Sequence, residues 1–169
     1  MAEARETFVD SQGLSIHCLE WGEPAGEPLV LIHGYLDLAH SWRAFVAALE
    51  KKHGDTPWII APDCRGHGDS GWVGAGGYYH FPDYVFDLDC VTRAFSAPSI
   101  RLIGHSMGGT ISLLYAGTFP KRVSKLSLIE GIGPLGMSYA DAPPRMEKWI
   151  TEVRERGRRR IGQCVHAGV

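Results

Sequence analysis

The sequence predicts an α/β fold, a mostly parallel β-sheet flanked by helices. Short uninterrupted apolar segments, such as Leu-Val-Leu-Ile at residues 29–32, are typical of strands covered on both faces. Between them lie segments with an apolar residue every three or four positions, which indicate amphipathic helices. Because the two kinds of segment alternate, successive strands should be joined by right-handed crossovers through helices.

The first third of the chain predicts a hairpin, two buried strands and a helix. Residues 7–9 and 14–19 are β-type segments, and Gly13 between them supplies turn geometry. Residues 29–32 and 58–61 are buried strands. Residues 38–49 form the helix, since they carry apolar residues at helical spacing: Trp42, Phe45, Val46 and Leu49.

The remaining elements complete a sheet of about six strands. Helices are predicted at residues 81–95 and 107–119, the second ended by Pro120, and strands at residues 99–103 and 123–129. After Glu130 the pattern changes. Residues 131–144 are a Gly- and Pro-rich connection, and residues 145–156 are a charged amphipathic helix followed by an arginine run at 158–160.

Composition excludes several functional classes. The chain has 169 residues, 44% of them apolar, and a formal net charge of −2, so it can bury a core but has no field that favours nucleic acid or an anionic membrane. The N-terminus lacks the apolar stretch of a signal peptide, and no segment reaches the roughly 20 apolar residues that span a bilayer. We therefore expect a cytoplasmic protein that binds neither nucleic acid nor membrane.

The four cysteines do not indicate a metal or redox site. Each is far from the others in sequence, and there is no C-x-x-C pair among Cys18, Cys64, Cys90 and Cys164. We expect reduced, mostly buried thiols, with no metal and no cofactor.

The segment Gly104-His105-Ser106-Met107-Gly108 is the candidate catalytic motif. It has the pattern G-x-S-x-G between a predicted strand and a predicted helix, where a sharp turn strains the serine and small residues keep strand and helix apart. Ser106 is then a nucleophile at a helix N-terminus, and the backbone N–H of Met107 points towards a developing oxyanion. The alternative is a turn that merely joins strand to helix.

The loop after residues 29–32 supplies the candidate for a second oxyanion donor. It begins His33-Gly34-Tyr35, and the backbone N–H of Tyr35 is that candidate. Gly34 permits close backbone approach, and His33 suits a hydrogen bond that fixes the loop better than it suits a catalytic base. The alternative is an ordinary tight turn.

These motifs resemble the α/β-hydrolase fold family. The resemblance rests on His33-Gly34, on the elbow with Gly109, and on Asp63-Cys64-Arg65-Gly66-His67-Gly68-Asp69-Ser70, which resembles the family's D-x-R-G-H-G-x-S loop and is implied to be structural. Three further segments resemble the serine-hydrolase-like group, relatives of the haloalkane dehalogenases: residues 35–37, 79–84 and 128–134. Those dehalogenases carry Asp at the nucleophile position, so Ser106 favours acyl-enzyme chemistry instead.

The resemblance also implies a domain division and a catalytic acid. Residues 1–134 are expected to form the hydrolase core, and residues 135–169 the start of a helical cap with a basic tail. Glu130, at the end of strand 123–129, is the candidate acid; a strand-end charge or an acid on a later strand are the alternatives.

No catalytic histidine is identifiable in the sequence. His105 should point away from the attack trajectory, the histidines at 17, 40 and 53 belong to earlier elements or their loops, and only His166 follows Glu130. The family places its base after the last strand. We therefore expect a truncated product, a partial gene model or one half of a split protein.

The expected function is hydrolysis of esters or related acyl bonds of small molecules, without a cofactor. A C–C bond hydrolase or a cofactor-free haloperoxidase of the same fold is the enzymatic alternative, and a pseudoenzyme or partner-binding fragment is the other. Strand 123–129 should be an open apolar sheet edge, through which self-association is expected. The arginine-rich segment 154–160 is expected to be a solvated helix face rather than an RNA or membrane contact.

Overall fold

The computed structural model of the chain describes residues 3–131 and 138–166. The chain divides into two compact units, Met1–Pro134 and Leu135–Val169, which are described separately below.

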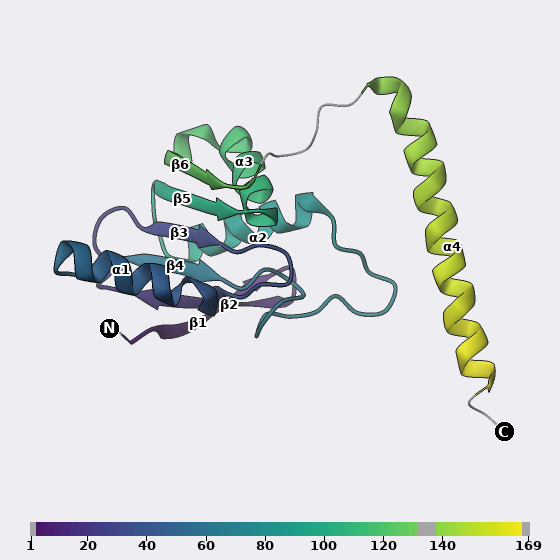
Figure 1. Ribbon diagram of the computed structural model, residues 1–169, viewed down its shortest axis with the longest axis horizontal. Helices are drawn as coiled ribbons and strands as arrows, with labels where there is room; N and C mark the ends of the chain where they lie inside the picture. The colour runs from purple at the N-terminus through teal and green to yellow at the C-terminus, as the bar shows by residue number, and fades with distance from the viewer. Residues whose placement is uncertain (1–2, 132–137, 167–169) are drawn as a thin grey trace. The chain divides into compact units, whose positions relative to one another are not determined.

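A six-stranded sheet forms the centre of the first unit (Figure 1), with strand order β1-β2-β4-β3-β5-β6. The pairs β1–β2 and β2–β4 are antiparallel, and β4–β3, β3–β5 and β5–β6 are parallel. The predicted α/β class and mostly parallel sheet are confirmed. The strands are β1 Arg5–Ser11, β2 Leu14–Trp21, β3 Leu29–Ile32, β4 Ile59–Pro62, β5 Ile100–His105 and β6 Val123–Ile129.

Three α-helices connect these strands. They are α1 Arg43–His53, α2 Phe81–Ala94 and α3 Met107–Thr118. The helix predicted at residues 38–49 differs from the prediction at both ends. It begins with a 3₁₀ turn, Ala39–Trp42, and α1 continues to His53, where Gly54 at φ 84° ends it and donates its N–H to the carbonyl of Glu50 at 2.8 Å.

Strand β3 shows why its sequence is continuously apolar. Val30 and Ile32 pack into one core cluster, together with residues of α2 and α3, whereas Leu31 packs into a second cluster with Trp42 and Val46. Successive side chains of a strand alternate between the two faces of the sheet, so a strand covered on both faces needs apolar residues at every position.

The second unit contains a 3₁₀ turn, Tyr139–Asp141, and the helix α4, Ala142–His166. This helix is longer at both ends than the predicted residues 145–156. Much of the predicted connection, residues 132–137, lies outside the described residues. In the described part of the chain, no helix combines the length and apolar character needed to cross a membrane.

Candidate active site

Ser106 occupies a strained turn between β5 and α3. Its backbone has φ 51° and ψ −114°, a conformation that residues with a side chain rarely adopt and that costs about 1–3 kcal/mol. The Ser106 N–H donates to the carbonyl of Ile129 at 2.8 Å, and its carbonyl accepts from the N–H of Thr110 at 3.2 Å. The turn is therefore fixed both by its own helix and by the end of β6.

The glycines around Ser106 are sterically required. A Cβ at Gly104 would lie 2.3 Å from the carbonyl oxygen of Gly108, and a Cβ at Gly108 would lie 2.3 Å from that of Ile32. These distances are well below van der Waals contact, and the atoms that would be met are backbone atoms that cannot rotate away. Strand and helix can cross this closely only because both positions lack a side chain.

A second close approach, which sequence reasoning missed, joins α3 to the segment after β6. A Cβ at Gly109 would lie 2.6 Å from the Cα of Gly131, and a Cβ at Gly131 would lie 2.5 Å from the Cα of Gly109. Gly109 follows the elbow directly, whereas Gly131 is far along the chain. In the sequence, the one signal of this contact is that both positions are glycine.

His33 is buried at the start of the predicted oxyanion loop, where both of its ring nitrogens are engaged. Nδ1 donates to the carbonyl of Gly34 at 2.7 Å, and Nε2 accepts from the backbone N–H of Cys64 at 2.8 Å. Burial lowers the pKa of His33 below its usual value, although the hydrogen bond to Gly34 opposes this effect. The neutral imidazole of His33 therefore holds the loop in place.

The loop after His33 is a tight turn that lies against the elbow. The N–H of Asp37 donates to the carbonyl of Gly34 at 3.2 Å, and Leu36 has φ 59°. A Cβ at Gly34 would lie 2.9 Å from Nδ1 of His105 and 3.4 Å from Cβ of Ser106. The structure thus brings the His33-Gly34-Tyr35 loop and the serine together, as the oxyanion hypothesis requires. The roles of the Tyr35 and Met107 N–H groups remain predictions.

Glu130 lies beside the elbow, but its close partner is His105. It follows β6 directly, with φ 54°, and its side chain is 83% exposed. Its Oε2 lies 3.8 Å from Nε2 of His105, an ion pair when that ring is protonated. The structure therefore places this carboxylate near the nucleophile, and its role as catalytic acid remains a prediction.

The base for Ser106 is unassigned among the described residues. His33 has both nitrogens engaged by the oxyanion loop and Cys64, and Nε2 of His105 faces Glu130. His166 ends α4, and its side chain lies outside the described part of the structure.

A cavity of about 250 Å³ opens beside His105. Its walls are Asp37, Ser41, Trp42, His105 and Ile129. Burial by itself would raise the pKa of Asp37, but hydrogen bonds from the Ser41 hydroxyl and the Leu38 N–H outweigh it and hold that pKa below its usual value. The Asp37 carboxylate therefore stays ionised on this wall of the cavity.

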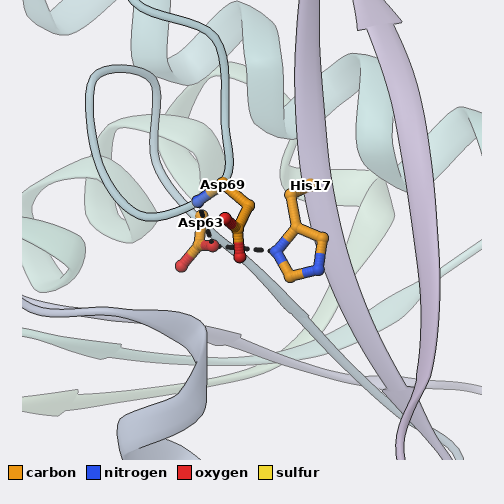
Figure 2. A group of neighbouring side chains, drawn as sticks. All are labelled: His17, Asp63 and Asp69. Atoms are coloured by element: carbon orange, nitrogen blue, oxygen red, sulfur yellow. Dashed lines mark hydrogen bonds and ion pairs between the residues drawn. The ribbon is translucent and has the colours of Figure 1, made fainter.

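A buried pair of side chains, His17 and Asp63, was also missed by sequence reasoning (Figure 2). Nδ1 of His17 lies 2.8 Å from Oδ2 of Asp63, and the N–H of Asp69 donates to the same oxygen at 3.1 Å. Nitrogen and carboxylate atoms of these three residues lie within 4.8 Å of one another, a spacing that metal ligands can have. A metal would have to displace the hydrogen bonds that Asp63 already accepts, so the arrangement suits hydrogen bonding better.

The comparisons with known proteins agree with this geometry. The family model described as the alpha/beta hydrolase fold matches residues 27–158. The structure agrees with this match, because a strained serine joins a strand to a helix and glycines allow the two to pack closely. The chain belongs to the α/β hydrolase fold family, as its sequence predicts.

The individual relatives are consistent with this assignment. A serine hydrolase-like protein from Danio rerio is 31% identical over 133 residues, which are 78% of this chain but 39% of the relative. The resemblance to the serine-hydrolase-like group is thereby confirmed. The crystal structure of a hypothetical protein from Pseudomonas aeruginosa PAO1 is 30% identical with a TM-score of 0.76, covering 86% of this chain and 50% of that one.

A third similar structure is the thioesterase domain from the curacin biosynthetic pathway. It is 25% identical with a TM-score of 0.71, and the match covers 89% of this chain and 54% of that one. The chain therefore spans only part of the length of each of these three relatives.

Proposed function

We propose that this chain carries the nucleophile of a serine hydrolase that cleaves ester or related acyl bonds of small molecules. The observation that carries the proposal is the strained backbone of Ser106, with φ 51° at the N-terminus of α3. A costly conformation at a polar residue, maintained by glycines on both sides, is a feature of functional sites. The serine hydrolase-like relative and the thioesterase domain support acyl chemistry.

In the proposed mechanism Ser106 attacks the acyl carbon. The Oγ–C bond forms as the serine proton passes to a histidine base, and the negative oxygen is held by the N–H groups of Tyr35 and Met107. The bond to the leaving alcohol then breaks, with the proton returned to that alcohol. Water then gives a proton to the same histidine and attacks the acyl carbon. The bond between that carbon and Oγ breaks, and the proton passes from the histidine to Ser106 as the carboxylic acid leaves. Glu130 orients the histidine, which none of the described residues supplies. The mechanism requires no cofactor.

Labelling with a fluorophosphonate tests the nucleophile. The reagent forms a covalent bond with an activated serine, so intact mass spectrometry should show one adduct and peptide mapping should place it on Ser106. The control Ser106→Ala should show none. Adduct formation on another residue, or equal labelling of Ser106→Ala, would overturn the assignment, and a folded protein that is never labelled would favour the non-catalytic alternative.

A further inference from the structure

The turn that presents Tyr35 is anchored at both ends by two adjacent residues of another segment. Before the turn, the N–H of Cys64 donates to Nε2 of His33 at 2.8 Å. After the turn, the N–H of Ala39 donates to Oδ1 of Asp63 at 2.7 Å. Because Asp63 and Cys64 follow β4 directly, the position of the proposed oxyanion loop depends on how firmly this short segment is held.

His17 holds Asp63 from the neighbouring strand. Its Nδ1 lies 2.8 Å from Oδ2 of Asp63, and both side chains are almost fully buried, at 0% and 1% exposed. Figure 2 shows the imidazole edge facing the carboxylate. Asp63 also donates its N–H to the carbonyl of His17 at 2.9 Å. Backbone and side chain of His17 therefore fix the same residue.

Hydrogen bonds fix the Asp63 carboxylate and the ring of His17 together. The carboxylate oxygens of Asp63 accept the backbone N–H groups of Ala39 and Asp69 and face Nδ1 of His17. Nε2 of His17 is buried without a hydrogen-bond partner among the described residues. The hydrogen bond from Nδ1 to Asp63 is therefore the one that orients this ring.

We propose that His17 and Asp63 are positioning residues for the oxyanion hole, acting through Ala39 and Cys64 on the turn that carries Tyr35. This inference rests on the proposed function. Both side chains are almost fully buried, at 0% and 1% exposed. The chain of contacts runs from His17 to Asp63, from Asp63 to the Ala39 N–H, and from there to the loop that lies against Ser106.

Two substitutions of His17 separate positioning from simple destabilisation. Asn places its amide NH₂ where Nδ1 of His17 donates, whereas Leu fills a similar volume without a donor. We expect His17→Leu to slow fluorophosphonate labelling of Ser106 about tenfold, since complete loss of an oxyanion donor costs about 10²–10³-fold and the N–H is displaced rather than removed. His17→Asn should restore most of the rate.

Hydrogen exchange gives a second readout that needs no catalysis. We expect the Ala39 amide to exchange about tenfold faster in His17→Leu than in the unchanged protein, because its acceptor loses its support, and to recover in His17→Asn. The matched control is Ser11→Ala, which removes a buried hydrogen bond to Asp87, 2.5 Å long, and leaves the partners of His17, Asp63 and Ala39 in place. It should change neither the labelling rate nor the exchange of Ala39.

The possible outcomes discriminate between this inference and the proposed function. Slow labelling and fast exchange in His17→Leu, both rescued in His17→Asn, support it. Equal effects of Leu and Asn, or effects of Ser11→Ala as large as those of His17→Leu, would overturn it. If the unchanged protein is not labelled, the proposed function fails. Exchange of Ala39 then decides alone whether His17 holds the loop.

Discussion

Ser106 has a backbone conformation in which its own Cβ is sterically disfavoured. At φ 51° and ψ −114°, glycine is free of the steric penalty that serine meets. We expect Ser106→Gly to raise the free energy of unfolding by about 1 kcal/mol, while abolishing fluorophosphonate labelling. Chemical denaturation of both proteins would measure the difference. A less stable Ser106→Gly variant would mean that the turn is not strained.

Gly108 and Gly117 lie in the same helix and should respond oppositely to alanine. A Cβ at Gly108 would meet the backbone carbonyls of Ile32 and His33 at 2.3 and 2.5 Å, whereas a Cβ at Gly117 meets nothing within 4 Å. We expect Gly108→Ala to destabilise the protein by about 3 kcal/mol and Gly117→Ala to stabilise it by about 0.5–1 kcal/mol. Thermal unfolding of the two variants measures this. Equal shifts would contradict the steric account.

His33 should make stability depend on pH. Burial lowers its pKa below the ordinary 6.5, so between those two values the unfolded chain binds a proton that the folded protein does not. Stability is therefore complete above 6.5 and falls as the pH drops through that value, by at most about 1.4 kcal/mol per pH unit. Denaturation at several pH values, compared with His33→Gln, isolates this contribution. If the unfolding free energy of His33→Gln depended on pH as steeply as that of the unchanged protein, His33 would not be the source of the dependence.

At the residue scale, sequence indicated distant contacts only where a known motif linked them, as with residues 33–35 and Glu130 beside Ser106. The elbow was predictable because strand, glycines, serine and helix are consecutive. The pair of His17 and Asp63 was not, because 46 positions separate the two residues and the motif that begins at Asp63 does not indicate its partner. The same reasoning applies to Gly131, whose partner Gly109 lies on another element.

At the element scale, a buried ion pair connects α2 to the rest of the first unit. Asp87 of α2 accepts two hydrogen bonds from Arg65, both 2.6 Å long, and a third from Ser11 of β1. The side chains of Arg65 and Asp87 are only 6% and 8% exposed. The hydrogen bonds to Asp87 raise the pKa of Arg65 further, so its charge is permanent.

Removing the Asp87 carboxylate should strongly lower the free energy of unfolding. Asp87→Ala would leave the Arg65 guanidinium buried without its counterion, and we expect a loss of about 3–5 kcal/mol of unfolding free energy. The control is Asp89→Ala in the same helix, because Asp89 pairs with the exposed Arg93 and should contribute little. Urea denaturation compares the two. Similar losses in the two variants would show that burial of the Arg65–Asp87 pair does not determine its contribution to stability.

The type of each element was easier to predict than its ends. Apolar periodicity identified helix α1 but missed its 3₁₀ beginning, Ala39–Trp42, because that turn is set by the hydrogen bond from Ala39 to Asp63 rather than by propensity. Strand β5 continues to His105, two residues past its predicted end. Pairing with β3 and β6, which local sequence does not encode, extends it.

At the scale of the whole molecule, β6 ends the sheet order and leaves one backbone edge unpaired within the sheet. Self-association through this edge remains a prediction. We expect Leu128→Lys, at a β6 position that is 38% exposed, to lower the association constant in sedimentation experiments. Leu113→Lys is the matched control, since Leu113 is 37% exposed but belongs to helix α3. If both variants act equally, general hydrophobicity rather than the strand edge drives association.

The hydrogen bond from the Ser106 N–H to the carbonyl of Ile129 gives the outermost strand a part in holding the proposed nucleophile. Figure 1 shows β6 at one end of the sheet, beside β5, which leads into the serine. Terminal strands fray more readily than central ones. Whenever the last residue of β6 frays, Ser106 loses the hydrogen bond that its N–H makes outside its own helix. A strand that stiffened this edge would therefore hold the proposed nucleophile more firmly without contacting its side chain.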